Sequence, residues 1–379
     1  MDSFNFKDKI CFTKAIYYNF NPIPLPRKFK DATGGMGLNA PEQGCIELYD
    51  SEGCVAHMTV TRGFVKNILP MILTGETLSY NEWRDSLYWK VRNQGHQSST
   101  AVEVGMLDLL MLDLLSQRHN KPLHRFLGAT KNWASAYKGG GSILLEDNEL
   151  LEDMIRYKEE GYTTVKFKVG SSSTDFDRDL RRIEKVRKAL GEDFEIAVDA
   201  NQKWTVDEAL EFDKLAKPYD LAWLEEPIHA HNMNGIKELK DRGINADVAF
   251  GESMRIYYAY ETYVEKGVDH LQPSYGRMSK IDDLLKIRDL ARKNNIRFSS
   301  GGRTFLNAVL GCLYNEDEKI EHHEPISMPV GEYTLYQPEE RKGRFYCQDD
   351  IVGNPQRMNI EKLEKDGLLE SKKIFYVNK

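Results

Sequence analysis

Lysines and carboxylates follow one another along this chain at the spacing of a repeated strand and helix unit. Lys168 lies 31 residues before Asp199, which lies 26 residues before Glu225. Glu252 follows after another 27 residues. A (β/α)8 barrel of roughly 250 residues uses about 30 residues per unit and gathers its chemistry at the carboxyl ends of its strands. The spacing therefore predicts a TIM-type barrel in which these side chains meet at one mouth.

The rest of the chain predicts a second, smaller domain around this barrel. At 379 residues the chain exceeds what one compact core usually organises. The predicted barrel strands are 134–137, 164–169, 194–199, 222–225, 248–252, 270–272, 297–300 and 320–324, mostly separated by amphipathic helical segments. We expect an α/β fold with a (β/α)7–8 TIM-type barrel at 129–327. An N-terminal α+β capping domain at 1–128 is completed by a C-terminal segment, 328–379, that packs back on the cap.

Two features of the predicted cap are informative. Residues 22–41 form a long connection rich in Pro, Gly and Lys, and long connections in compact domains are often functional lids. We expect a mobile lid there. Residues 100–118 predict a helix that is apolar almost all round and must be buried between layers. Thr100 and Glu103 have the spacing of an N-terminal capping box for this helix.

Composition and charge narrow the class of function. The formal net charge is -7, from 52 Lys and Arg against 59 Asp and Glu, which argues against general binding to nucleic acid or to an anionic membrane. Five cysteines without a CxxC pair indicate reduced thiols and neither a disulfide framework nor a zinc ribbon. No secretory signal and no run of about 18 apolar residues is evident. We expect a cytoplasmic enzyme acting on a small molecule.

Lys166 and Lys168 lie on one face of a predicted strand. In residues 164–169 the period of two sends both lysines one way and Val165 and Phe167 the other. Alone, such a pattern indicates a solvated strand edge, but a parallel barrel strand meets water only at its ends. Two neighbouring ammonium groups in a partly buried site disfavour each other's protonation, so one lysine could act as a base near pH 7.

The three carboxylates predict a divalent metal site. Taken singly, each of these carboxylates is more simply interpreted as a surface charge or a helix N-cap. Together, Asp199, Glu225 and Glu252 supply oxygen ligands from adjacent strands, which suits Mg²⁺. No His or Cys cluster indicates zinc. A dication beside a lysine suits removal of a proton α to a carboxylate, because it stabilises the charge of the enolate.

These motifs resemble those of the enolase superfamily, in the mandelate racemase and muconate-lactonizing group. The matching segments are Lys166-Phe167-Lys168, Asp199-Ala200-Asn201, Glu225-Glu226-Pro227 and Gly251-Glu252-Ser253, together with the passage from Ser99 to Gly128. The resemblance spans nearly the whole chain. It implies the chemistry known for this superfamily, a Lys or His base with Mg²⁺ stabilising an enolate.

The resemblance also implies roles for single residues. Asp199, Glu225 and Glu252 match the Mg²⁺ ligands, and Lys168 matches the base, with Lys166 tuning it and approaching the substrate carboxylate. Glu324 matches an acid on the last strand that hydrogen-bonds the substrate, although a solvated loop residue is an equal alternative. Further expected neighbours of the substrate or of these residues are Asn201, Ser274 and Arg303. A homo-oligomer is expected from the resemblance alone.

Two departures from the family pattern affect the predicted reaction. The sixth strand ends in Gln272-Pro273-Ser274 and the seventh in Ser299-Ser300-Gly301-Gly302, so the Asp and His of the racemase pair are missing. Ser274 is also not the second lysine of cycloisomerase-type relatives. A site with one base remains, to which Arg303, Tyr275, His322 or His323 could add a proton donor, although a packing or surface role is the simpler interpretation of each.

We therefore expect Mg²⁺-dependent proton abstraction α to a carboxylate, followed by dehydration of a hydroxy acid or sugar acid. The alternative is a racemase, epimerase or cycloisomerase with an atypical second base. More remote alternatives are a glycoside hydrolase, because barrels often carry two catalytic carboxylates, and a binding protein without catalysis. The expected partner is a small carboxylate, and the sequence does not name it.

Overall fold

Eight parallel strands close into a barrel in the computed structural model, which describes residues 4–41 and 44–377. The strands are β8 (Trp133–Gly139), β9 (Thr164–Lys168), β10 (Glu195–Asp199), β11 (Trp223–Glu225), β12 (Val248–Phe250), β13 (His270–Leu271), β14 (Arg297–Ser300) and β15 (Lys319–His323). Each strand pairs with its successor, and β15 pairs with β8 to complete the ring. The predicted TIM-type barrel is confirmed.

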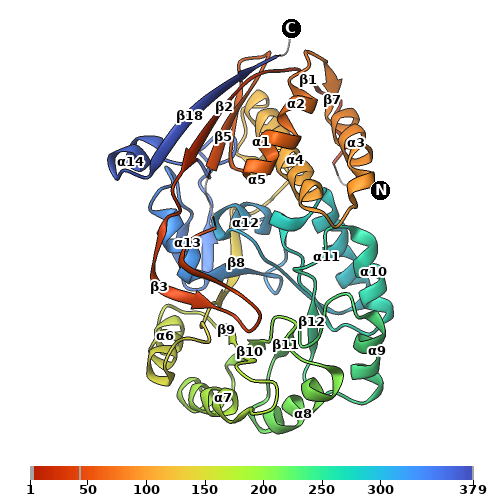
Figure 1. Cartoon of the computed structure of the whole chain (residues 1–379), viewed down its shortest axis with the longest axis vertical. Helices are drawn as coiled ribbons and strands as arrows, with labels where there is room; N and C mark the ends of the chain where they lie inside the picture. Colours follow the sequence, from red (N-terminus) through yellow and green to blue (C-terminus); the bar gives the residue numbers. More distant parts are fainter. Residues whose placement is uncertain (1–3, 42–43, 378–379) are drawn as a thin grey trace.

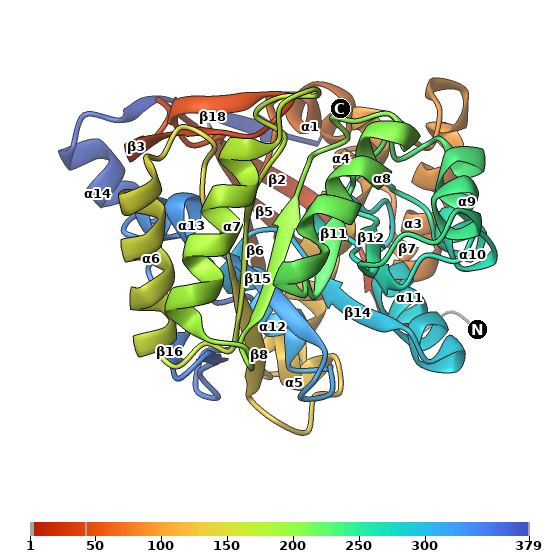
Figure 2. The same cartoon turned by 90° about the horizontal axis from the view of Figure 1, so that it is seen from below.

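Helices follow the strands and surround them on the outside (Figures 1 and 2). They are α6 (Asp147–Glu159), α7 (Asp177–Leu190), α8 (Val206–Ala216), α9 (Met233–Asp241), α10 (Tyr257–Glu265), α11 (Asp282–Asn294), α12 (Thr304–Gly311) and α13 (Glu324–Gly331). In α7 the buried Ile183, Val186 and Leu190 recur at helical spacing, so one face packs on the strands while the charged face meets water.

The other end of the molecule is built from residues 4–41 and 44–130 together with the last strand. An antiparallel sheet has the order β18 (Leu369–Tyr376), β2 (Phe12–Phe20), β5 (Gly44–Asp50) and β6 (Val55–Thr59). Helices α1 (Arg62–Asn67), α2 (Leu69–Ile72), α3 (Tyr80–Lys90), α4 (Ser99–Arg118) and α5 (Leu123–Phe126) pack beside it, with the short strands β1 (Lys9–Ile10) and β7 (Leu78–Ser79). Figure 1 shows the last strand running beside the first long one. Among the described residues, no helix has the length and apolar character needed to cross a bilayer.

The C-terminal segment divides between both parts of the molecule. The hairpin β16 (Glu339–Arg341) and β17 (Arg344–Tyr346) pairs with barrel strand β8, and only after α14 (Ile360–Lys365) does β18 join the N-terminal sheet. We expected the whole segment to pack on the cap. The difference arises because β17 satisfies backbone groups at the start of β8, where β9 and β15 do not reach.

Residues 22–41 are more regular than the predicted loop. They form a hairpin of β3 (Pro24–Lys30) and β4 (Gly35–Asn39) that extends from the cap towards the barrel (Figure 1). The backbone N–H of Lys30 donates to Ser142 Oγ at 2.9 Å, and Thr33 Oγ1 donates to the carbonyl of Asn201 at 3.0 Å. The hairpin therefore rests on loops that follow β8 and β10.

Helix α4 joins the cap to the mouth of the barrel. Its N-cap is Ser98, which accepts from the N–H of Ala101, so the predicted capping box at Thr100 is wrong. Glu103 instead accepts from Asn67 Nδ2 at 2.9 Å. A Cβ on Gly105 would lie 1.9 Å from the carbonyl oxygen of Met278, so glycine permits the close approach of α4 to the loop after β13.

Buried charged side chains stabilise the contact between the cap helices α3 and α4 and the barrel. Tyr80 donates to Asp108 at 2.5 Å, and the other Asp108 oxygen accepts from the backbone of Ile281 at 2.8 Å. Arg84 of α3 lies 3.1 Å from Asp282 of α11, and both side chains are at most 1 % exposed. Burial raises the pKa of Asp108 to about 6, and the guanidinium beside it opposes this shift and favours the charged form of that carboxylate.

Arg84→Ala tests whether these buried charges stabilise the contact between the cap and the barrel. The change leaves Asp282 and Asp108 buried without their guanidinium, and we expect it to lower the free energy of unfolding by about 3–5 kcal/mol. Urea denaturation followed by circular dichroism measures the loss. Arg92→Ala, at an exposed position, is the control and should change stability by less than about 0.5 kcal/mol. Equal stability of the two variants would contradict the assignment.

Candidate active site

The carboxyl ends of β9, β10 and β11 bring lysines and carboxylates into direct contact. Lys166 and Lys168 point into the barrel, while Val165 and Phe167 are buried in the core outside it, as the period of two predicts. Lys168 Nζ lies 2.5 Å from Asp199 Oδ2. Lys166 Nζ lies 2.5 Å from Glu225 Oε1 and 3.4 Å from Asp199.

Glu321 of β15 is a further member of this group. Its Oε1 lies 3.0 Å from Lys166 Nζ, so Lys166 is surrounded by three carboxylates from three strands. Lys166 is 1 % exposed and Glu321 is 12 % exposed. The sequence analysis missed Glu321, although a strict period of two from Lys319 to His323 would have indicated it.

The ion pairs decide the charge of both lysines. Burial acts to lower the pKa of Lys166, but Glu225, Glu321 and Asp199 outweigh it and hold the pKa well above the ordinary value. Burial acts in the same direction on Lys168, and Asp199 outweighs it, so that pKa is also raised. The expectation of a neutral lysine is therefore not met in the structure, because each ammonium group has a carboxylate in contact.

Carboxyl groups outnumber ammonium groups at this mouth. Asp199, Glu225, Glu226, Glu252 and Glu321 interact with one another and with only two lysines. Burial, followed by repulsion from Asp199, raises the pKa of Glu252, and burial with repulsion from Glu252 raises the pKa of Glu226 to about 8. The site therefore has more carboxyl groups than its two lysines can pair, and burial with mutual repulsion favours the protonated form of some of them.

This donor set fits a hard dication, although it is not arranged around one. All the acidic donors are carboxylate oxygens, which Mg²⁺ prefers. Asn201 Oδ1 is also buried without a hydrogen-bond partner in the described part of the chain. No group of three Asp, Glu, His or Cys side chains among the described residues is gathered closely enough to hold a metal ion. The reason is that Lys166 and Lys168 hold oxygens of Glu225 and Asp199.

The backbone after two of these strands adopts an unusual conformation. Asn201, Gln202 and Glu226 have φ of 43°, 65° and 37°, in the left-handed region that side chains seldom occupy. The N–H of Asn201 donates to Asp199 Oδ1 at 2.8 Å, and Gln202 Nε2 donates to Glu226 Oε2 at 2.9 Å. Strained residues of this kind gather at functional sites and persist because neighbouring contacts fix them.

A cavity of about 550 Å³ lies above these residues, between the barrel and the cap. Its barrel side is lined by residues that include Lys168, Asn201, Glu252, Ser274, Arg303, Glu321 and His323. Its cap side is lined by α4 and by Phe29 and Asp31 of the β3–β4 hairpin. Asn201, Ser274 and Arg303, which we predicted as substrate neighbours, all border this space.

Comparison with known proteins identifies the family. A model described as enolase C-terminal domain-like matches residues 149–348, which is more than half of the chain. The chain belongs to the enolase superfamily, in the mandelate racemase and muconate-lactonizing group.

The relatives of this superfamily member include lyases and isomerases. L-talarate/galactarate dehydratase of Salmonella typhimurium is 28% identical over 84% of this chain and 76% of its own length. L-Ala-D/L-Glu epimerase of Clostridium acetobutylicum is 31% identical over 94% of this chain and 97% of its own. A racemase from Streptomyces coelicolor A3(2), solved with bound magnesium, is 25% identical, with a TM-score of 0.80 over 94% and 99% of the two chains. The chain is therefore an enzyme of lyase or isomerase type, and the glycoside hydrolase alternative is set aside.

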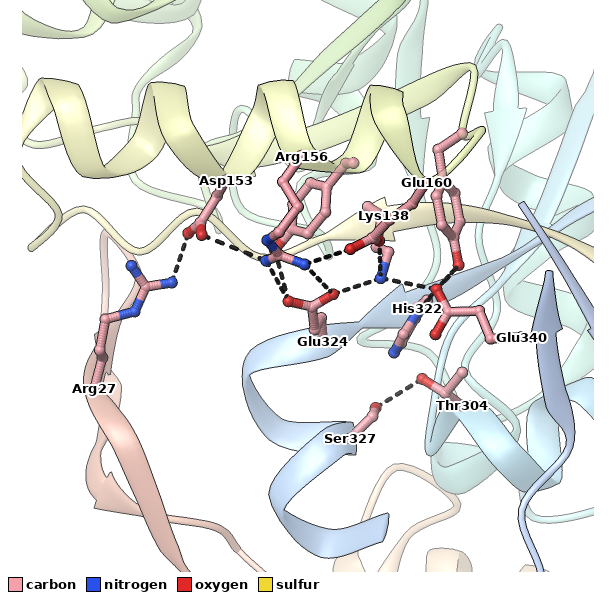
Figure 3. Close-up of polar contacts among 12 residues, drawn as sticks. Arg27, Lys138, Asp153, Arg156, Glu160, Thr304, His322, Glu324, Ser327 and Glu340 are labelled. Atoms are coloured by element: carbon pink, nitrogen blue, oxygen red, sulfur yellow. Dashed lines mark hydrogen bonds and ion pairs between the residues drawn. The ribbon is translucent and has the colours of Figure 1, made fainter. Parts of the chain in front are cut away.

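Glu324 does not lie where the family resemblance predicted. Strand β15 ends at His323, and Glu324 opens α13 outside the barrel. Figure 3 shows its carboxylate between Arg156 of α6 and Lys138 of β8, with which it forms ion pairs. The prediction for Glu324 was wrong. The side chains of β15 that point into the barrel have odd numbers, so Glu321, three residues earlier, takes the place expected for Glu324.

The adjacent histidines, His322 and His323, face opposite sides of β15. His322 is fully buried against the ring of Phe345, 4.9 Å between centroids, and its Nδ1 lies 3.4 Å from Tyr162 Oη. His323 borders the cavity and packs edge to face on Phe29, 4.7 Å between centroids. Burial, together with Lys168 and Lys166, lowers the pKa of His323 to about 4 against the opposing effect of Glu321. Only His323 can meet a substrate.

The ends of the sixth and seventh strands carry a neutral polar layer in this superfamily member. His270 Nε2 lies 2.8 Å from Ser299 Oγ, and Gln272 Nε2 donates to Ser299 Oγ at 3.4 Å. Burial holds the pKa of His270 well below its ordinary value, so its imidazole stays uncharged. Tyr275 packs beside this layer, donating to the Arg303 carbonyl at 3.2 Å.

Proposed function

We propose that this enzyme removes the proton α to a carboxylate of a polar hydroxy acid or sugar acid and then eliminates water. The observation that supports this most is the amine of Lys168, which borders the cavity beside Asp199 and Glu252. An α-proton is weakly acidic, so the base and the stabilisation of the new charge have to be in one place.

Asp199, Glu225 and Glu252 are the residues that would hold Mg²⁺. When bound, the ion supplies stabilisation for the negative charge that develops on the substrate carboxylate. The surplus of carboxyl groups supports this role, as do the name of the Streptomyces racemase, which has bound magnesium, and membership of the superfamily. Side chains of the protein carry out the proton transfers and orient the substrate.

Lys168 accepts the α-proton as a neutral amine, a form that its ion pair with Asp199 disfavours and that would return if Asp199 held Mg²⁺ instead. Lys166, held by its ion pair with Glu321, orients the substrate carboxylate. The leaving hydroxyl departs from the adjacent carbon as the new double bond forms. Lys168, now an ammonium group, returns a proton so that water leaves, which balances the elimination with one base. His323 is the best placed of the four candidate donors to hydrogen-bond the leaving hydroxyl, because its Nδ1 is buried without a partner in the described chain.

An isomerase is the second candidate. It is favoured by the epimerase relative from Clostridium acetobutylicum, which aligns over nearly its full length. Against it stands the wall of the cavity after β13 and β14, which Ser274, Tyr275 and Arg303 line. Among the described residues, this wall offers no second amine or imidazole opposite Lys168. Epimerisation needs a proton delivered to the other face of the carbon, whereas elimination does not.

The β3–β4 hairpin is proposed as the lid of the site. Phe29 contacts His323, and Thr33 holds the loop of Asn201, so the hairpin covers the cavity from the cap side. Arg27 fastens it to the barrel through an ion pair of 2.6 Å with Asp153 of α6, seen at the left of Figure 3. The capping domain 1–128, the barrel 129–327 and the segment 328–379 are proposed as the units of the chain.

A homo-oligomer and a cytoplasmic location also remain proposals. Multi-angle light scattering of the purified chain tests the first, and a monomer at micromolar concentration would contradict it. Cell fractionation tests the second, and recovery outside the cytoplasm would contradict it.

The first prediction about the reaction concerns Lys168. With Mg²⁺, the wild-type enzyme should exchange the α-proton of an acid substrate with deuterium and release water, and EDTA should stop both. Lys168→Ala should lower the exchange rate by about 10²–10⁴-fold, because the base is gone. Mass spectrometry of a panel of sugar acids, hydroxy acids and amino-acid derivatives reads both events. Lys188→Ala, on the outside of α7, is the matched control.

The same panel separates the candidate functions. Deuterium incorporation without loss of 18 mass units would favour the isomerase. Exchange that survives both EDTA and Lys168→Ala would end the proposal, and no exchange in any acid would favour a binding protein.

The second prediction concerns His323. His323→Leu should lower kcat for water loss by about 10²-fold, since one hydrogen-bond donor to the leaving group is lost. Proton exchange should persist, because Lys168 is intact. His119→Leu, at an exposed site in the cap, is the control. A parallel fall of exchange and dehydration, or no fall in either, would contradict the role.

The third prediction concerns the lid. Arg27→Gln removes the ion pair with Asp153 and should increase cleavage of the hairpin by a protease at low concentration, with the barrel intact. Arg341→Gln, on the exposed strand β16, is the control. Cleavage at the wild-type rate would show that this ion pair does not hold the lid.

A further inference from the structure

Two arginines border the cavity on the side away from the lysine strand. Arg255 lies in the loop between β12 and α10, and Arg277 ends a short 3₁₀ turn, η3 (Tyr275–Arg277), after β13. Lys168 ends the second strand of the ring, and the sixth strand stands opposite the second in an eight-stranded barrel. Both ends of this one cavity therefore carry positive side chains.

Within the described residues, neither of the two guanidinium groups makes an ion pair with Asp or Glu. Arg255 Nη1 donates to the carbonyl of Ser253 at 3.2 Å, and Arg255 Nε is buried without a hydrogen-bond partner in the described part of the chain. Burial and repulsion from Arg277 lower the pKa of Arg255. Arg277 also lowers the pKa of Glu252, but from beyond ion-pair distance.

Several other cations near this mouth or in the cap lie against an acceptor. Lys138, at 1 % exposure, lies against three carboxylates, and Arg84 lies against Asp282. Arg303, on the same cavity, donates to Thr59 of the cap. Arg277 is exposed and its charge is solvated, whereas Arg255 is half-buried and repelled by Arg277, so an anionic ligand between the two would be favourable.

We propose that Arg255 and Arg277 form a subsite for a second anionic group of the substrate, at the end distant from the α-carbon. The inference rests on the proposed function and adds the substrate class: an acid with two anionic ends, the distal one a carboxylate or a phosphate. A planar guanidinium binds either group through two parallel hydrogen bonds. A cavity of about 550 Å³ has room for a six-carbon acid spanning from Lys168 to the arginine pair.

Binding to the Mg²⁺-loaded full chain tests the subsite without requiring turnover. Isothermal titration compares acids of equal length: gluconate with one anionic end, glucarate with two carboxylates, and 6-phosphogluconate with a carboxylate and a phosphate. Galactonate and galactarate repeat the comparison in a second sugar configuration. We expect at least one acid with two anionic ends to bind at least about tenfold more tightly than the acid of the same sugar configuration that has one anionic end. The preference for glucarate or for 6-phosphogluconate identifies the distal group.

Variants locate the effect. Arg255→Gln and Arg277→Gln should each remove most of this preference and leave the affinity for gluconate and galactonate unchanged. Arg242→Gln is the matched control, because Arg242 is exposed near the end of α9 and pairs with Asp207 and Glu238. Equal binding of acids with one and two anionic ends, binding of none of them, or variants that keep the preference would each overturn the subsite.

The outcome is separable from the proposed reaction. Lys168→Ala should keep the preference, since it leaves both arginines in place. A preserved preference without any proton exchange would sink the proposed function and leave the subsite standing. If acids with one anionic end exchange their α-proton as fast as acids with two, the subsite is contradicted and the proposed function is kept.

Discussion

The structure depends on pairing buried charges at the carboxyl ends of the barrel strands. Lys166, Lys168, Asp199 and Glu225 lie almost fully out of water, where an isolated charge costs several kcal/mol. The ion pairs reduce this cost, but five carboxyl groups share two lysines. Burial, followed by repulsion from Asp199, raises the pKa of Glu252, and the carboxyl groups without a lysine partner give a dication a place to bind. Charge balance thus connects the fold to the proposed chemistry.

The cap completes the site because the barrel mouth alone is open to water. Gly105 lets α4 approach the loop after β13, and the Arg84–Asp282 ion pair fixes that approach. The β3–β4 hairpin then covers the cavity from the other side, with Phe29 against His323. Excluding water strengthens each electrostatic interaction inside, so the packing of the cap bears directly on the reactivity of the lysine.

The sequence was sufficient for the barrel and for the strands that carry the charged residues. Spacing of about 30 residues is set by the geometry of one βα unit, so Lys168, Asp199, Glu225 and Glu252 could be assigned to strand ends. Single positions were harder where a strand ends. Glu324 was chosen in place of Glu321 because the end of β15 could not be located to within three residues, and a period of two makes such an error change the face.

Properties that depend on several distant segments could not be predicted. The direction of the lysine pKa shift depends on which carboxylates lie within about 3 Å, and those come from β10, β11 and β15. Likewise, Arg255 and Arg277 are unremarkable in the sequence and stand out only because the cavity places them together without an acidic partner. The hairpin at 24–39 was read as an irregular loop, since Pro, Gly and Lys are rare in strands and its order comes from contacts with Ser142 and Asn201.

The distribution of titratable groups around the cavity favours elimination over epimerisation. Lys168 approaches from β9, whereas Ser274, Tyr275 and Arg303 line the facing wall after β13 and β14. A carbanion formed on this side is not readily protonated from the other by Ser274, whose hydroxyl proton is far less acidic than an ammonium group. Expelling a hydroxyl needs no such group, because the proton that Lys168 has gained can leave with it. The missing racemase pair is therefore consistent with a complete site for dehydration.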